Sequence, residues 1–90
     1  MNVYYSRAFK KDYQELPTDI RAQAEKQLGL FVENPRHPSL RVQKIRGSPR
    51  PRWEGRITRG YRFTFEWEGD TVILRRIGSH ALIDREARAP

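Results

Sequence analysis

The chain has 90 residues, contains no cysteine and carries a formal net charge of +7 at pH 7. A chain of this length buries roughly 60–65% of the surface it exposes when unfolded, which predicts one domain over residues 1–90. The lack of cysteine excludes a disulfide framework, a cysteine-ligated zinc site and a thiol nucleophile, and it suits a reducing compartment. No segment approaches the ~20 apolar residues of a membrane span, so we expect a cytoplasmic protein without a membrane partner.

The positive charge is concentrated in one part of the chain. Residues 36–62 contain nine basic side chains and a single acidic one, Glu54, which gives this segment +8 and the remainder −1. Eight of the nine are arginine, whose planar guanidinium binds phosphate through two parallel hydrogen bonds. This segment favours a nucleic-acid partner, although a solvated basic face or a patch for an acidic protein would share its composition.

The first third of the chain predicts a short strand and two helices. Residues 2–5 are β-prone, and Ser6 is a suitable N-cap for a first helix. A second helix is expected from Thr18 to Glu33, and Gly29 within it predicts close approach to the first helix or the sheet. One face of this second helix has an apolar stripe formed by Ile20, Ala24, Leu28 and Phe31.

A strand and a loop are expected next. Residues 40–46 alternate in polarity until Ile45 breaks the pattern, which predicts a strand with a bulge near Gln43 and Lys44. Residues 47–51 hold two prolines and a glycine, so they predict a loop that presents positive charge to a flexible partner.

Three antiparallel strands are predicted between Arg52 and His80. Aromatic residues alternate with polar ones over residues 61–67, a pattern typical of a strand with one buried face. This parity assigns Trp53 and Trp67 to core packing in preference to base stacking, and it directs Arg62 away from the core. The run at residues 71–77 is apolar on both parities and predicts a strand in the sheet interior.

These elements predict an α+β fold with two N-terminal helices packed on one face of a small antiparallel sheet. The arginines would then lie on the other face. Residues 84–90 are expected to form a last helical turn or a disordered tail, with Asp84 and Glu86 in solvent.

The order of these elements, together with several local strings, resembles the RelE/ParE superfamily of bacterial toxin–antitoxin toxins. The strings are FKKDYQELP, FVENPRHPSL, KIRG followed by WEGRI, GYRFTF, and LRRIGSH, and they cover nearly the whole chain. The resemblance implies a small basic toxin that an antitoxin binds and silences. It also implies one of two activities, because RelE-like members cut mRNA in the ribosomal A site whereas ParE-like members inhibit DNA gyrase and are not nucleases.

The resemblance implies roles for individual residues. Arg62 matches the arginine of the family's G-Y-R string, which contacts the scissile phosphate in nuclease members, and Arg56 matches a basic position on the preceding strand. The G-S-H ending resembles the YafQ-like branch and assigns proton transfer to His80. Residues 81–83 depart from other nuclease members in lacking a tyrosine, and the chain has no second matched histidine, so the general base is left open.

Metal-free RNA cleavage requires a base for the 2′-hydroxyl, positive charge on the developing phosphorane, and an acid for the leaving 5′-oxygen. A histidine side chain, with an ordinary pKa of about 6.5, can act as either base or acid, and arginines stabilise the charge. Glu54 could be the base, although a neutralising ion-pair role is favoured for it, and His37 is expected to be structural. RNA binding is expected from Arg41, Lys44, Arg46, Arg50 and Arg52.

The main hypothesis is a metal- and cofactor-independent endoribonuclease, an mRNA interferase that cleaves ribosome-bound mRNA and so inhibits translation. A non-enzymatic gyrase inhibitor of the ParE type is one alternative, and a toxin fold that binds RNA without cutting it is another. The G-S-H ending and the pair Arg56 and Arg62 favour the nuclease.

Overall fold

The computed structural model describes residues 1–87, and residues 88–90 of the predicted tail lie outside the described part. Five strands form one sheet in the order β1-β5-β4-β3-β2. The elements in chain order are β1 (Asn2–Tyr5), α1 (Arg7–Gln14), α2 (Thr18–Glu33), the 3₁₀ helix η1 (Pro38–Leu40), β2 (Gln43–Lys44), β3 (Trp53–Thr58), β4 (Tyr61–Glu68), β5 (Thr71–Ser79) and α3 (His80–Ala87).

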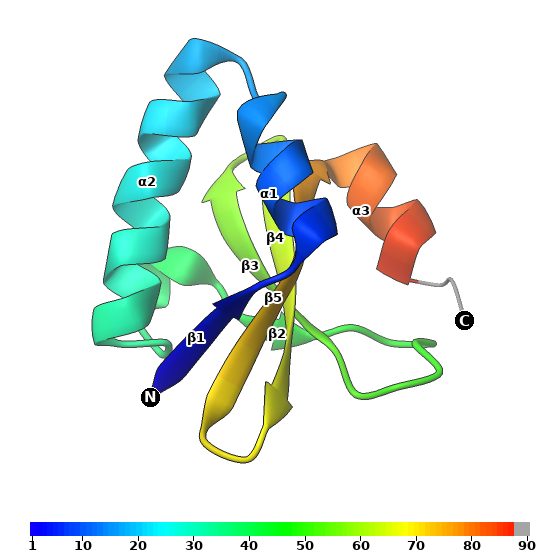
Figure 1. The fold of residues 1–90 in the computed structure, drawn as a ribbon. Helices are drawn as coiled ribbons and strands as arrows, with labels where there is room; N and C mark the ends of the chain where they lie inside the picture. Colours follow the sequence, from blue (N-terminus) through cyan, green and yellow to red (C-terminus); the bar gives the residue numbers. More distant parts are fainter. Residues whose placement is uncertain (88–90) are drawn as a thin grey trace.

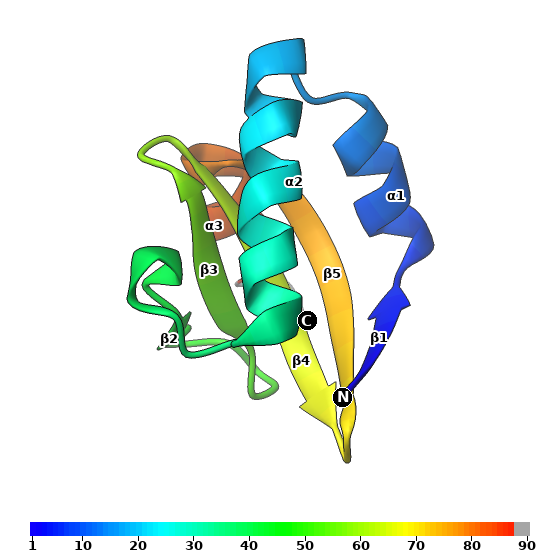
Figure 2. The same cartoon turned by 90° about the vertical axis from the view of Figure 1, so that its left-hand side faces the viewer.

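The helices lie on both sides of the sheet. Helices α1 and α2 cover one face, as predicted, and α3 lies against β4 and β5 on the opposite face (Figures 1 and 2). Strands β3, β4 and β5 are antiparallel neighbours, which confirms the predicted three-stranded unit. The sheet is not wholly antiparallel, however, because β1 pairs in parallel with β5, placing Val3 opposite Val72. No hairpin joins these two strands, so turn chemistry could not indicate their direction.

Helix α1 covers an open edge of β5. The Ser6 hydroxyl accepts the Phe9 N–H at 3.1 Å, which confirms the predicted N-cap, and it donates to the Arg75 carbonyl at 2.9 Å. Beyond the end of β1, Asp12 accepts the Ile77 N–H at 3.2 Å and contacts Arg76 Nε at 2.6 Å. This carboxylate hydrogen bond raises the pKa of the Arg76 guanidinium above its ordinary value. The first helix therefore satisfies the strand edge that β1 leaves unpaired.

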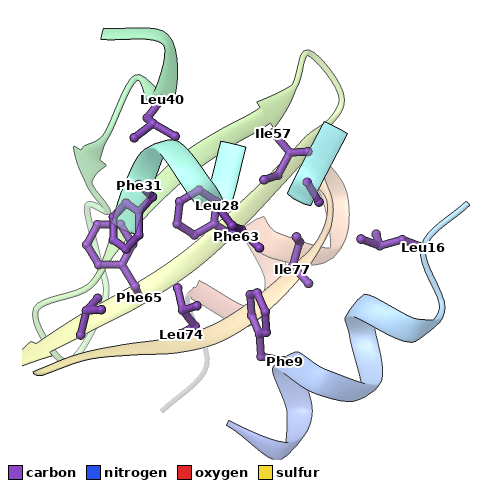
Figure 3. Packing of buried hydrophobic residues seen from close by; sticks show 12 residues of the cluster. Phe9, Leu16, Leu28, Phe31, Leu40, Ile57, Phe63, Phe65, Leu74 and Ile77 are labelled. Atoms are coloured by element: carbon purple, nitrogen blue, oxygen red, sulfur yellow. The ribbon is translucent and has the colours of Figure 1, made fainter. Parts of the chain in front are cut away.

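The core forms where α2 meets β4 (Figure 3). The Phe31 ring lies edge-on to Phe63 and Phe65, with centroids 5.2 and 4.8 Å apart. Leu28 is also buried, as the predicted α2 stripe requires. Trp67 was wrongly assigned to the core, because it is 40% exposed. Strand β4 runs past the end of α2, so the helix does not cover this end of the sheet (Figure 2).

Two further local predictions were wrong. Gly29 faces open space and approaches no other element, since a Cβ added there would meet nothing within 4 Å. The strand expected over residues 40–46 is reduced to Gln43 and Lys44, because η1 and a left-handed Arg41 (φ 45°) precede it. Register shifts lie instead between β3 and β4, at Arg56 to Thr58, and between β4 and β5, where Thr64 and Phe65 face Arg76 and Leu74. The extra β5 residue at this bulge lets both Leu74 and Ile77 face the core.

Gly29 and Gly55 have opposite surroundings, so replacing each with alanine tests the packing through its effect on stability. A Cβ at Gly55 would overlap the buried ring of Phe63, so Gly55→Ala is expected to destabilise the fold by about 1–3 kcal/mol. Gly29→Ala is expected to stabilise it by about 0.5–1 kcal/mol, because alanine is the better helix former and has space. Urea unfolding followed by circular dichroism measures both changes, and shifts in the same direction would contradict this packing.

Candidate active site

The G-S-H segment forms the junction between β5 and α3. Gly78 leaves room for the Leu82 side chain, which a Cβ would overlap, and the Ser79 hydroxyl caps α3 by accepting the Leu82 N–H at 3.3 Å. The His80 N–H donates to the Gly60 carbonyl at 2.9 Å, which ties this junction to the turn between β3 and β4. Each residue of the segment therefore helps to place the imidazole at the start of a helix beside the arginine-bearing turn.

A polar groove of about 350 Å³ lies beside this junction, and we call it the His80 groove. It brings together four of the predicted site residues from three parts of the chain. These are Lys44, Arg46, Arg62 and His80, and Gln43, Ile45, Glu54 and Asp84 complete the lining.

Asp84 is exposed, as predicted, but its pairing with His80 was not predicted. Its Oδ2 lies 3.1 Å from His80 Nε2, one helical turn further along α3. Both side chains are about half exposed, at 53% for the aspartate and 55% for the histidine. The spacing i, i+4 would have indicated this pair, had the helix been predicted to begin at His80. At this distance the carboxylate forms an ion pair with the imidazole whenever the ring is protonated.

The two predicted phosphate-binding arginines face each other across strands β3 and β4. Arg56 and Arg62 are register partners, and Arg62 Nη1 is anchored by the carbonyls of Thr58 at 2.7 Å and Arg59 at 3.0 Å. Partial burial, together with the positive charges of Arg41, Arg62 and Arg59, lowers the pKa of Arg56 from its ordinary value. The guanidiniums repel one another, so this face of the sheet would be stabilised by an anion.

Four of the predicted residues do not line the groove, namely Arg41, Arg50, Arg52 and Arg56, whereas the acidic Glu54 does. The positive charge of Arg41 contributes to the lowered pKa of Arg56. Arg50 is exposed in the loop at residues 47–51. Glu54, for which an ion pair was favoured, accepts a hydrogen bond from Gln43 Nε2 at 2.9 Å. Its carboxylate shares the groove with His80.

Arg52 was wrongly assigned to RNA binding, because it is buried with only 2% of its side chain exposed. Its Nε donates to Glu66 at 2.9 Å, and Arg75 Nη1 lies 3.2 Å from the same carboxylate. Arg75 also pairs with Glu86 at 2.9 Å, and Arg52 Nη1 donates to the Glu86 carbonyl at 3.4 Å. Glu86, predicted to be solvated, is thus the α3 member of a buried ion network that holds this helix on the sheet.

His37 has the structural role that was predicted for it. Its Nδ1 accepts the Ser39 N–H at 3.2 Å and so caps the short helix η1. Among residues 1–87, no group of three or more histidine, aspartate or glutamate side chains is arranged to hold a metal ion. No helix in this part of the chain has the length and apolar character needed to cross a membrane.

Several solved protein structures share this architecture. No protein-family model and no curated protein sequence matches the chain. Among solved structures, YafQ from E. coli superposes with a TM-score of 0.76 at 14% identity, covering 91% of this chain and 96% of YafQ. A chain of the RelB-RelE antitoxin-toxin complex from Methanococcus jannaschii superposes with a TM-score of 0.71 at 24% identity, covering 90% and 94%.

A third similar structure is the YoeB/ParE toxin from Agrobacterium tumefaciens, with a TM-score of 0.70 at 16% identity over 89% of this chain and 99% of that one. These proteins share one α+β architecture. The chain therefore has the fold of the RelE/ParE toxins, which confirms the predicted fold class. YafQ, one of the structures similar to this chain over about nine tenths of its length, typifies the branch that the G-S-H ending resembles.

The burial of Arg52 predicts a stability effect that an RNA-binding residue would not have. Arg52→Ala leaves the network incomplete and is expected to destabilise the fold by about 3–5 kcal/mol. Arg50→Ala, in the exposed loop two residues earlier, is expected to stay within about 0.5 kcal/mol of the wild type. Urea denaturation of the two variants makes the comparison, and equal stabilities would show that Arg52 is not a structural residue.

Proposed function

We propose that this protein is the toxin of a toxin–antitoxin system and a metal-independent endoribonuclease that cleaves ribosome-bound mRNA in the cytoplasm. The observation that supports this most directly is the presence of His80 and Arg62 in one groove bordered by Lys44 and Arg46. A group able to transfer protons thus lies beside a guanidinium and two further cations, and RNA cleavage requires this combination.

The proposed reaction is an attack by the 2′-hydroxyl on the adjacent phosphorus. A base takes the hydroxyl proton, the 2′-oxygen bonds to phosphorus, and the bond to the 5′-oxygen breaks as that oxygen receives a proton. His80 performs one proton transfer and Glu54, across the same groove, is the candidate for the other. Arg62 and Arg56 stabilise the charge on the phosphorane. The products are a 2′,3′-cyclic phosphate and a free 5′-hydroxyl.

The partner that controls this activity is proposed to be an antitoxin protein. Two similar structures are titled as complexes of this kind, DinJ-YafQ and RelB-RelE. In this chain an apolar hollow of about 400 Å³ lies between α1 and α2 and includes Tyr5, Phe9 and Val32. Tyr5 and Val32 are more than 40% exposed, so an antitoxin that covers this hollow would bury apolar surface.

The two histidines of the chain provide a matched pair of variants. His80→Ala removes the proton-transfer group and is expected to lower cleavage by about 10²–10⁴-fold while the fold is retained. His37→Ala changes only the cap of η1, so it is expected to keep cleavage near the wild-type rate. Each variant is expressed in a bacterial host, and mRNA 5′ ends, protein synthesis and DNA synthesis are followed separately.

These measurements separate the three hypotheses. New mRNA ends with wild type and His37→Ala, but not with His80→Ala, support the nuclease. An arrest of DNA synthesis with intact mRNA would favour the gyrase inhibitor and contradict the proposal. An arrest of translation without new ends, unchanged in His80→Ala, would indicate a toxin that binds RNA and does not cut it.

A further inference from the structure

A second hollow opens beyond the end of α2, on the face of the sheet that this helix covers, and we call it the aromatic pocket. It measures about 270 Å³ and adjoins another hollow of about 280 Å³ that contains Arg41. The floor of the aromatic pocket is the buried Phe65, and its walls come from the chain after α2 and from two tryptophans. The lining residues are Pro35, Arg36, Val42, Trp53, Phe65 and Trp67.

The two indole rings of the pocket pack against the Phe65 ring in different orientations. Trp53 stacks on Phe65 with an interplanar angle of 20° and centroids 6.2 Å apart. Trp67 stands edge-on to the same ring at 85° and 6.3 Å. Trp67 is 40% exposed and Trp53 is partly exposed, so both offer aromatic surface to a ligand. Exposed tryptophans on a rigid strand pair are the kind of platform on which bases stack.

The charges around the pocket select for an anionic ligand. Arg36 lines the pocket and its N–H is fixed by Asn34 Oδ1 at 3.1 Å, while Arg41 lines the adjoining hollow. Acidic side chains line neither hollow. A guanidinium can stack on a base or bind a phosphate, whereas an apolar peptide would gain nothing from it. Flat aromatic surface next to arginine therefore fits a nucleotide better than a peptide.

The aromatic pocket and the His80 groove are lined by consecutive residues of one segment, since Val42 lines the pocket and Gln43 and Lys44 line the groove. Strand β2 is the edge strand, and its Lys44 is the register partner of Trp53. Lys44 also lines the His80 groove. A single-stranded chain leaving the groove over Lys44 would therefore pass close to Trp53 of the aromatic pocket.

We propose that the aromatic pocket holds an unstacked base of the same single-stranded RNA whose backbone lies in the His80 groove. This inference rests on the proposed ribonuclease function and adds to it a second contact point. Stacking on Trp67 and Trp53 supplies affinity with little dependence on base identity. The anchored base would set the position of the scissile phosphate relative to His80, because both sites hold one continuous strand.

The test measures RNA binding in chains that cannot cut the probe. In a His80→Ala background, fluorescence anisotropy of a fluorescein-labelled single-stranded RNA decamer gives Kd for the parent and for each variant. Trp67→Leu keeps apolar bulk but loses the aromatic ring, and it is expected to raise Kd about tenfold or more. Trp67→Phe keeps a ring and is expected to stay within about threefold of the parent. Tyr4→Ala removes an exposed aromatic side chain from β1, the edge strand opposite β2, and this control should not change Kd.

The outcomes distinguish this inference from the proposed function. If Trp67→Leu leaves the Kd for RNA unchanged, the base site is rejected. This holds even if the single substitution His80→Ala abolishes cleavage. A raised Kd for Trp67→Leu in a chain whose wild type never cuts RNA keeps the base site and rejects the nuclease. Absence of measurable RNA binding by the parent also overturns the inference. Weaker binding of an acidic protein by Trp67→Leu, measured in the same way and with RNA binding unchanged, would assign the pocket to a protein partner and overturn the inference as well.

Discussion

The buried ion network between the sheet and α3 determines where the proposed chemistry can take place. Arg52, Glu66, Arg75 and Glu86 alternate in charge and connect β4, β5, α3 and the start of β3. A buried charge without its partner is strongly destabilising, so these four side chains tolerate few arrangements other than the one observed. Since His80 begins α3, the network that places this helix also places the imidazole beside Arg62.

The distribution of arginines reflects two different uses of the same side chain. Arg52, Arg75 and Arg76 are paired with carboxylates and stabilise the fold, whereas Arg56 and Arg62 face each other as like charges. Partial burial lowers the pKa of Arg56, and the positive charges of Arg41, Arg62 and Arg59 lower it further. A protein that keeps unneutralised guanidiniums beside a proton-transfer group gives up stability, and a phosphate ligand would restore it. This contrast is a physical reason to connect the face with an anionic substrate.

Local patterns predicted the parts of the fold that depend on nearby residues. The bounds of α2, the Ser6 cap and the strands β3 to β5 follow from periodicity and turn residues within a few positions. Of the predicted site residues, His80 and Arg62 line one groove, and their roles in RNA cleavage stay a prediction. The burial of Arg52 could not be read from composition, because its partner Glu86 is 34 residues away in the chain. The exposure of Trp67 depends on where α2 stops covering the sheet, which strand alternation does not encode.

The chemical form of the RNA ends tests the central claim most directly. Purified protein is incubated with ribosomes programmed with a defined mRNA, and the fragments are compared with those from an mRNA carrying a single 2′-deoxy nucleotide 5′ to the cleaved bond. The account predicts a 2′,3′-cyclic phosphate and a 5′-hydroxyl from the normal mRNA, and no cleavage at the deoxy position. Cleavage of the deoxy substrate at the normal rate, or a 5′-phosphate end, would contradict attack by the 2′-hydroxyl.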